Sequence, residues 1–193
     1  MALRTALAAS LIAWVALDHT ASAGTITGTV KLKADAPAVV FVESATGTFE
    51  APKDHARMDQ KGMMFAPYLL PILVGTTVDF LNSDSVNHNV FSPDNEGYNL
   101  GTWPKGQTRS YTFKKAGVYT QLCSIHPEME AFVIVLQNPY FAVVDKDGKF
   151  TIANVPDGHY ALKVFSKKLK KPEKEKKFSV DVVKGAGTAT IAF

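Results

Sequence analysis

The strongest constraint on the fold is a period-2 alternation of polar and apolar residues that recurs along the chain, with no convincing amphipathic helical stripe. Short segments of this kind, or short apolar runs, lie at residues 25–32, 38–42, 76–81, 86–91, 110–113, 118–122, 132–136, 141–144, 150–152, 160–165, 178–183 and 188–193. Turn sequences such as Asp147-Gly148 and Lys184-Gly185 separate them. Many short strands at close spacing predict an all-β protein built from antiparallel β-sandwiches.

Length and composition limit the number of domains, the kinds of partner and the disulfides that are possible for the chain. Its 193 residues are enough for one or two domains, each with its own core. A formal net charge of +3 is too small to indicate a nucleic-acid partner. The single cysteine, Cys123, has no second cysteine with which to form an internal disulfide. If the protein is exported to an oxidising compartment, this thiol needs another explanation.

The first 23 residues have the pattern of a secretory signal peptide. Arg4 precedes an apolar run that ends at Leu17, and small residues lead up to Ala23. The apolar run is shorter than the roughly 20 residues that span a bilayer, and Asp18 interrupts it. We therefore expect cleavage before Gly24, a periplasmic location and no membrane-spanning segment in the mature chain.

Three potential metal ligands lie within seven residues, on a predicted loop between two strands: Cys123, His126 and Met129. Thiolate, imidazole and thioether together suit copper in both oxidation states, and two His with one Cys and a long axial Met make the blue-copper electron-transfer site. His88 is the best-placed second histidine, between a polar turn and an apolar strand. Each residue alone could be structural, but their joint spacing favours a metal loop. Zinc is disfavoured because methionine is a poor zinc ligand.

Residues 51–138 resemble the cupredoxins, in particular the plastocyanin and amicyanin type. Three parts carry this resemblance: a strand over residues 71–81 that ends in Asn82-x-Asp84, the element His88-Asn89-Val90, and the loop Cys123-x-x-His126-Pro127-x-Met129. The resemblance implies a Greek-key β-sandwich. It also implies copper ligation by His88, Cys123, His126 and Met129.

The resemblance further implies that Asn89 steadies the copper loop by hydrogen bonding. Redox partner proteins are then expected to dock near His126, at an apolar patch for which the candidates are Ile125, Pro127, Pro93 and Phe65.

Two alternatives stay open within this segment. Glu128 and Glu130 flank Met129, so a carboxylate could be the axial ligand instead. A loose group of His and Met residues is interpreted as strand and core residues, although a Cu(I)-transport site is the alternative; its members are His55, Met58, Met63 and Met64.

The flanking segments predict a second domain. Residues 147–162 resemble the carboxypeptidase regulatory-like, transthyretin-like module, and residues 24–30 resemble its opening strand. We expect a signal peptide at 1–23, the first part of a transthyretin-like sandwich at 24–50, the cupredoxin at 51–138 and the second part at 139–193. Two opening strands and about five later ones would complete this sandwich. His159 is expected in a turn before a strand, with a structural role.

Residues 167–177 hold seven Lys and two Glu, a local net charge of +5. A solvated hairpin between two strands is the simpler interpretation. A docking patch for an acidic partner is the alternative, and the sequence does not decide between them.

The sequence therefore predicts a type 1 copper protein that carries single electrons in the periplasm. It is not expected to be an enzyme, because the sequence has no His-x-His pair, no Gly-x-Ser-x-Gly and no His-Glu-x-x-His. Two other functions stay open: a copper-binding or delivery protein, and a partner-binding surface module with an incidental copper site.

Overall fold

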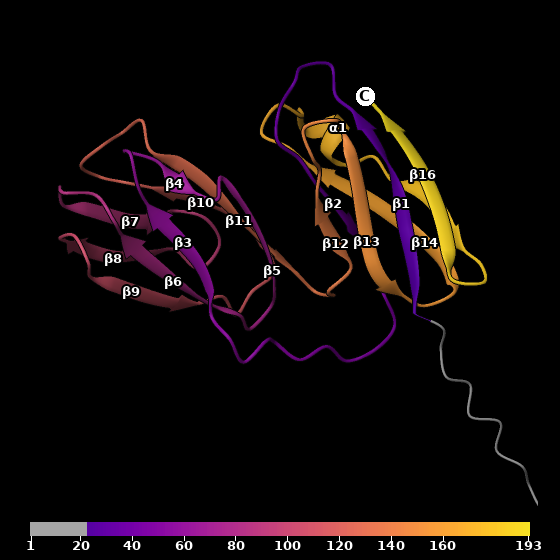
Figure 1. The fold of residues 1–193 in the computed structure, drawn as a ribbon, viewed down its shortest axis with the longest axis horizontal. Coiled ribbons are helices and arrows are strands. Elements are labelled where there is room, and N and C mark those ends of the chain that lie inside the picture. The colour runs from indigo at the N-terminus through magenta and orange to yellow at the C-terminus, as the bar shows by residue number, and fades with distance from the viewer. Residues whose placement is uncertain (1–22) are drawn as a thin grey trace, which may run out of the picture.

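The computed structural model describes residues 23–193, which form four β-sheets arranged as two sandwiches side by side (Figure 1). The fold class is as predicted: the described residues are almost entirely β-strands and loops, in two β-sandwiches. The predicted signal peptide lies outside the described residues. In the part of the chain that is described, no helix has the length and apolar character needed to cross a membrane.

The first sandwich contains the strands from β3 to β11. One sheet has the order β4-β3-β6-β9 and the other β5-β11-β10-β7-β8. The strands are β3 (Ala56–Gln60), β4 (Phe65–Ala66), β5 (Leu69–Leu73), β6 (Thr77–Asn82), β7 (His88–Ser92), β8 (Tyr98–Trp103), β9 (Thr108–Thr112), β10 (Gly117–Leu122) and β11 (Glu130–Leu136).

The second sandwich combines two strands from the start of the chain with five from its end. Its sheets have the orders β13-β1-β16 and β12-β2-β14-β15. The strands are β1 (Gly24–Lys31), β2 (Val39–Val42), β12 (Phe141–Val143), β13 (Lys149–Val155), β14 (Gly158–Phe165), β15 (Phe178–Val182) and β16 (Ala186–Ala192). β1 lies between β13 and β16, antiparallel to the first and parallel to the second.

Strand β11 explains how the two sandwiches are joined. Its residues Ala131, Val133 and Val135 belong to the core of the first sandwich. Its residues Phe132, Ile134 and Leu136 belong to a separate buried cluster that includes Val39 and Phe165 of the second sandwich. Because both faces of β11 are buried, its sequence is a continuous apolar run rather than an alternating one.

Some predicted strand positions were wrong. The predicted strand at residues 71–81 is two strands, β5 and β6, which lie in different sheets and are separated by a turn at Gly75, where φ is +89°. The sequences of β3 and β8 have no clear alternation of polar and apolar residues, so the periodicity did not predict these strands. β8 contains Gly101 at φ +76° and has a register irregularity opposite β7, which breaks the expected pattern. His159 is the second residue of β14, not a turn residue, and its Nδ1 lies 2.7 Å from Asp181.

The basic segment is the exposed connection of a hairpin, as the simpler interpretation expected, because the strands before and after it, β14 and β15, are antiparallel neighbours. It contains a single helical turn, α1 (Lys171–Lys174), between β14 and β15. Pro172 fits the first turn of a helix, where its missing N–H leaves no bond unmade. The Glu173 carboxylate accepts a hydrogen bond from the Lys170 N–H at 3.1 Å and so caps this turn.

Candidate metal centre

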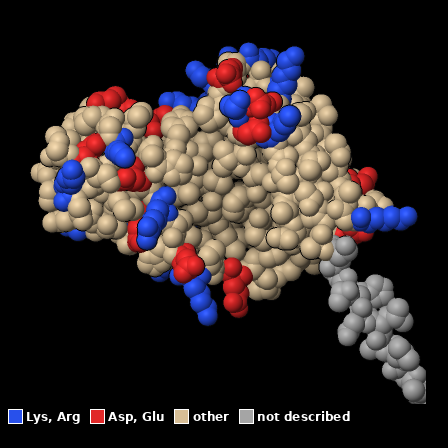
Figure 2. Space-filling view, in the orientation of Figure 1, with Lys and Arg blue, Asp and Glu red and all other residues tan. Residues whose placement is uncertain are grey.

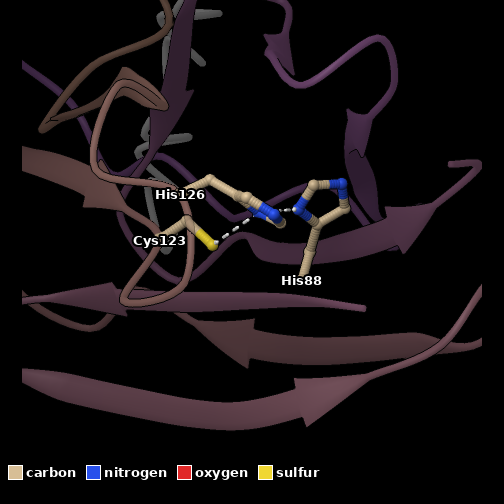
Figure 3. Close-up of side chains that lie close together, drawn as sticks. All are labelled: His88, Cys123 and His126. Carbon is tan, nitrogen blue, oxygen red and sulfur yellow. Dashed lines mark hydrogen bonds between the residues drawn. The ribbon is translucent and has the colours of Figure 1, made fainter. Parts of the chain in front are cut away.

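Three of the predicted ligands meet at one end of the first sandwich (Figure 3). His88 is the first residue of β7, and Cys123 directly follows β10. These strands are antiparallel neighbours, with Leu122 opposite Phe91, so the start of one lies beside the end of the other. His126 lies on the loop that leads from β10 to β11, and its ring and that of His88 are arranged edge to face, with centroids 4.8 Å apart.

The donor atoms have the spacing of ligands of one ion. Nδ1 of His126 lies 3.0 Å from Nδ1 of His88 and 3.8 Å from Sγ of Cys123. Donors bound to a single ion at about 2.0 Å for nitrogen and about 2.3 Å for sulfur lie about 3–4 Å apart. His88 is fully buried, and the Cys123 side chain is also buried. Two imidazoles and a thiolate with this spacing fit copper.

Asp84 orients His88. Its Oδ2 lies 2.9 Å from Nε2 of His88, on the side of the ring away from Cys123 and His126. The backbone N–H groups of Met63 and Gly62 donate to the same carboxylate, at 2.9 and 2.6 Å. The hydrogen bond from Met63 contributes most to lowering the pKa of Asp84 to about 2, with Gly62 and His88 adding to it against the effect of desolvation. An ionised Asp84 keeps the proton of His88 on Nε2 and leaves the Nδ1 lone pair for a metal.

Asn82 fixes the turn that carries Asp84. Its Nδ2 donates to the carbonyl oxygens of Val86 and Trp103, at 2.9 and 3.0 Å, and its Oδ1 accepts from the Asp84 N–H. The sequence motif included Asn82 and Asp84, but no role was assigned to either. The four-residue spacing between Asp84 and His88 was the available signal, since it allows a turn to bring carboxylate and ring together.

Asn89 ties the loop of Cys123 to β7 and β8, as expected. Its backbone N–H points to Sγ of Cys123 at 3.4 Å, and its Oδ1 accepts from the Ser124 N–H at 3.2 Å. Its Nδ2 donates to Asn99 Oδ1 and to the Gly101 carbonyl, at 2.9 and 2.8 Å. A hydrogen bond to the sulfur stabilises the thiolate and tunes the potential of a bound metal.

Met129 and the two carboxylates that flank it have different surroundings. Met129 is buried in the same apolar cluster as Cys123, and its N–H donates to the His126 carbonyl at 3.0 Å. Glu130 is engaged elsewhere, because its Oε1 lies 2.5 Å from Nζ of Lys167 and accepts from the Tyr68 hydroxyl. Glu128 is exposed.

The other His and Met residues of this segment do not gather. Met58 is a fully buried core residue, as expected. His55 precedes β3 and lies 2.9 Å from Asp79, whereas Met63 follows the opposite end of that strand. Met64 is 63% exposed, His55 is exposed and Met63 is partly exposed. All three lie outside the strands, so their interpretation as core or strand residues was wrong.

The surface beside His126 contains only part of the expected patch. His126 is partly exposed, Ile125 is 44% exposed and Pro127 is exposed. Phe65 is buried and cannot contribute, because it belongs to the core. Pro93 follows β7 at the end opposite His88.

Comparisons with known proteins give two family matches. Residues 52–136 match the copper binding proteins of the plastocyanin/azurin family. Residues 115–190 match domain II of polysaccharide lyase family 4, which supports in part the prediction of a second β domain. The two matches overlap on β10 and β11, whose pairing places them in the first sandwich. A search of curated proteins found no match.

Solved structures with similarity include a copper-containing nitrite reductase from Thermus scotoductus SA-01, at 29% identity and a TM-score of 0.43, over 50% of this chain and 25% of the reductase. A purple cupredoxin from Nitrosopumilus maritimus is 32% identical with a TM-score of 0.38, over 42% of this chain and 98% of that protein. The P52G variant of amicyanin is 28% identical with a TM-score of 0.41, over 51% and 97%.

Proposed function

Because residues 52–136 match the plastocyanin/azurin family of copper binding proteins, we propose that the protein is a one-electron carrier. Four side chains would hold the copper: His88, Cys123, His126 and Met129. The observation that carries the proposal is the convergence of two imidazole nitrogens and one thiol sulfur within 4.8 Å of one another. When bound, copper supplies a Cu(II)/Cu(I) couple at this position.

The chain's own contribution is a site that needs little rearrangement on electron transfer. Asp84 holds the ring of His88, and the Asn89 N–H holds the sulfur of Cys123. Both ligands are buried, so water does not reorganise around them when the charge of the site changes. A ligand set that suits both oxidation states, held rigidly, favours fast one-electron exchange.

His126 is the proposed exit for the electron. It is the partly exposed member of the three clustered side chains, and Ile125 and Pro127 add exposed apolar surface beside it. A redox partner that docks on this loop would approach the metal through a single imidazole ring.

We further propose that the cupredoxin domain spans residues 51–138 and is inserted between the two parts of a second sandwich, 24–50 and 139–193. Strand pairing supports this, because β1 and β2 pair only with strands from the end of the chain among the described residues. A periplasmic location, after cleavage of residues 1–23, and a non-enzymatic role complete the proposal.

The test is a titration of the purified mature chain with Cu(II), followed by visible absorption, EPR and voltammetry. We expect an intense thiolate-to-copper band, a type 1 EPR spectrum and a reversible one-electron wave. Cys123→Ser should abolish the band while the fold is kept. The matched control is Ser124→Ala, which changes the neighbouring exposed side chain and should leave the band in place.

Two results would overturn the proposal. A wild-type protein that binds copper without the thiolate band would not be a type 1 copper protein. A band without a reversible wave would point to copper storage or delivery instead.

A further inference from the structure

The basic segment of the second sandwich begins beside the metal loop. Nζ of Lys167 lies 2.5 Å from the Glu130 carboxylate, and Glu130 directly follows the proposed ligand Met129. The Tyr68 hydroxyl donates to the same carboxylate. Residues that are distant in sequence are thus brought together, and the first lysine of the run contacts the residue after the copper loop.

Most charges in this segment are not neutralised within the molecule. Its two acidic residues already have other partners, because Glu173 pairs with Lys33 at 2.8 Å and Glu175 lies 3.6 Å from Lys163. Of its seven lysines, only Lys167 and Lys177 have ion pairs among residues 23–193.

The other five lysines divide into two groups. Lys174 and Lys176 lie over the aromatic rings of Phe165 and Phe193. Three are exposed, with neither an acid nor a ring as a partner in the described part of the chain: Lys168, Lys170 and Lys171. Figure 2 shows Lys and Arg side chains, with some acidic ones among them, gathered over the part of the second sandwich that carries α1.

We propose that the copper loop and the basic segment form one docking surface for an acidic redox partner protein. This inference rests on the proposed electron-carrier function and names the chemistry of its partner. Ile125 and Pro127 would provide the apolar contact next to His126, while Lys168, Lys170 and Lys171 attract the partner. Unpaired surface charges of one sign raise association rates of oppositely charged proteins, and salt screens the effect.

A protein fits this surface better than a membrane or a nucleic acid does. Glu173, Glu175 and Glu43 lie among the lysines, so the surface has both signs of charge. A mixed pattern beside an apolar patch favours a partner with its own pattern of charges over a uniform polyanion.

The first experiment measures binding without relying on redox activity. The ¹⁵N-labelled copper-free protein is titrated with the copolymer poly(Glu,Tyr), a probe that offers both carboxylates and apolar rings, and is followed by NMR. We expect amide shifts both at residues 167–171 and at residues 124–128. The triple variant K168Q/K170Q/K171Q should weaken binding on the order of tenfold. The control K114Q/K115Q/K184Q removes the same charge from three other exposed lysines. Lys114 and Lys115 precede β10, at the end away from Cys123, and Lys184 follows β15, at the end away from α1. This control should change binding by less than about twofold.

The second experiment is stopped-flow oxidation of the Cu(I) protein by hexacyanoferrate(III). One electron passes from copper to the iron complex, giving Cu(II) and hexacyanoferrate(II). We expect the rate constant to fall with rising ionic strength, and to fall on the order of threefold or more at low salt in K168Q/K170Q/K171Q but not in the control.

Three outcomes would overturn the docking surface. The first is amide shifts confined to residues 167–177, with none at residues 124–128, and the second is equal effects of the two triple variants. The third is that K168Q/K170Q/K171Q loses binding to phosphatidylglycerol vesicles while its electron transfer is unchanged. The last would indicate a membrane instead. Failure of the proposed function looks different, because binding of the copolymer would persist at both segments while the copper protein showed no thiolate band and no electron transfer.

Discussion

At the residue scale, one carboxylate decides which nitrogen of His88 is available to a metal. Asp84 is held by two backbone N–H groups from the loop after β3, so its own position does not depend on the histidine. Removing the charge would leave the ring free to exchange its proton between Nε2 and Nδ1. The metal centre thus depends on a residue outside the ligand set.

The low pKa of Asp84 makes a prediction about acid stability. Its folded-state pKa, about 2, is below the ordinary value of 3.8, so its stabilising effect is complete above about pH 4 and is lost as the pH falls through about 2. Between about pH 5 and about pH 2, the copper-free wild type should lose about 2 kcal/mol more than Asp84→Asn in free energy of unfolding. Urea denaturation at both pH values measures this. Equal losses in the two proteins would contradict it.

The axial position can be tested by two substitutions. Gln in place of Met129 offers a harder oxygen donor, which stabilises Cu(II) relative to Cu(I). A tenfold relative stabilisation lowers the potential by about 59 mV, and we expect at least this shift.

Glu130→Gln is the matched comparison and should move the potential much less, because its carboxylate faces Lys167 and Tyr68. Voltammetry of both variants decides the point. A larger effect from Glu130→Gln would make the carboxylate the better axial candidate.

At the element scale, β11 belongs to two interiors at once. Its alternate side chains pack in the first sandwich and against the second, and Phe132 meets Phe165 with ring centroids 5.3 Å apart. This strand also begins next to Met129. Packing between the sandwiches is therefore linked through one element to the end of the metal loop.

A double-mutant cycle tests this contact. Phe132→Ala should cost about 3 kcal/mol in free energy of unfolding. Combined with Phe165→Ala, it should show a coupling energy of about 1 kcal/mol by urea denaturation. Phe178 packs on Phe193 instead, so Phe178→Ala should add to Phe132→Ala within about 0.5 kcal/mol. Additivity for both pairs would mean that the two sandwiches do not stabilise each other here.

At the scale of the whole molecule, a buried apolar cluster joins the two sandwiches. Trp103 is the only tryptophan in residues 23–193 and lies in the first sandwich, so its fluorescence reports on that part, whereas circular dichroism reports on all strands. With the sandwiches packed together, we expect the two signals to change at the same temperature.

Copper should stabilise this unit as a whole. At a free metal concentration of about 100 times Kd, the gain is about 2.7 kcal/mol, and removal with a chelator should reverse it. Both fluorescence and circular dichroism transitions should move upward together. A second dichroism step that copper leaves unmoved would show that the second sandwich unfolds independently.

Most of the strands could be predicted, and three of the proposed ligands could be singled out, because the information is local. Alternation with a period of two identifies a strand from its own residues, and Cys123, His126 and Met129 are on one loop. The irregular strand β8 was missed because Gly101 and its register shift break this local pattern. The helical turn α1 was not predicted, because the interpretation of residues 167–177 rested on their charge and not on the position of Pro172.

By itself, the sequence determined the all-β class, the copper-type donor set and the two separated halves of a second domain as expectations. Only the tertiary structure decided that Asp84 and two N–H groups hold His88, that Glu130 turns away to Lys167, and that the basic segment starts beside the metal loop. Periodicity and ligand spacing are properties of neighbouring residues, whereas these contacts join residues far apart in the chain. Such contacts depend on how the sheets pack, and no local pattern encodes that packing.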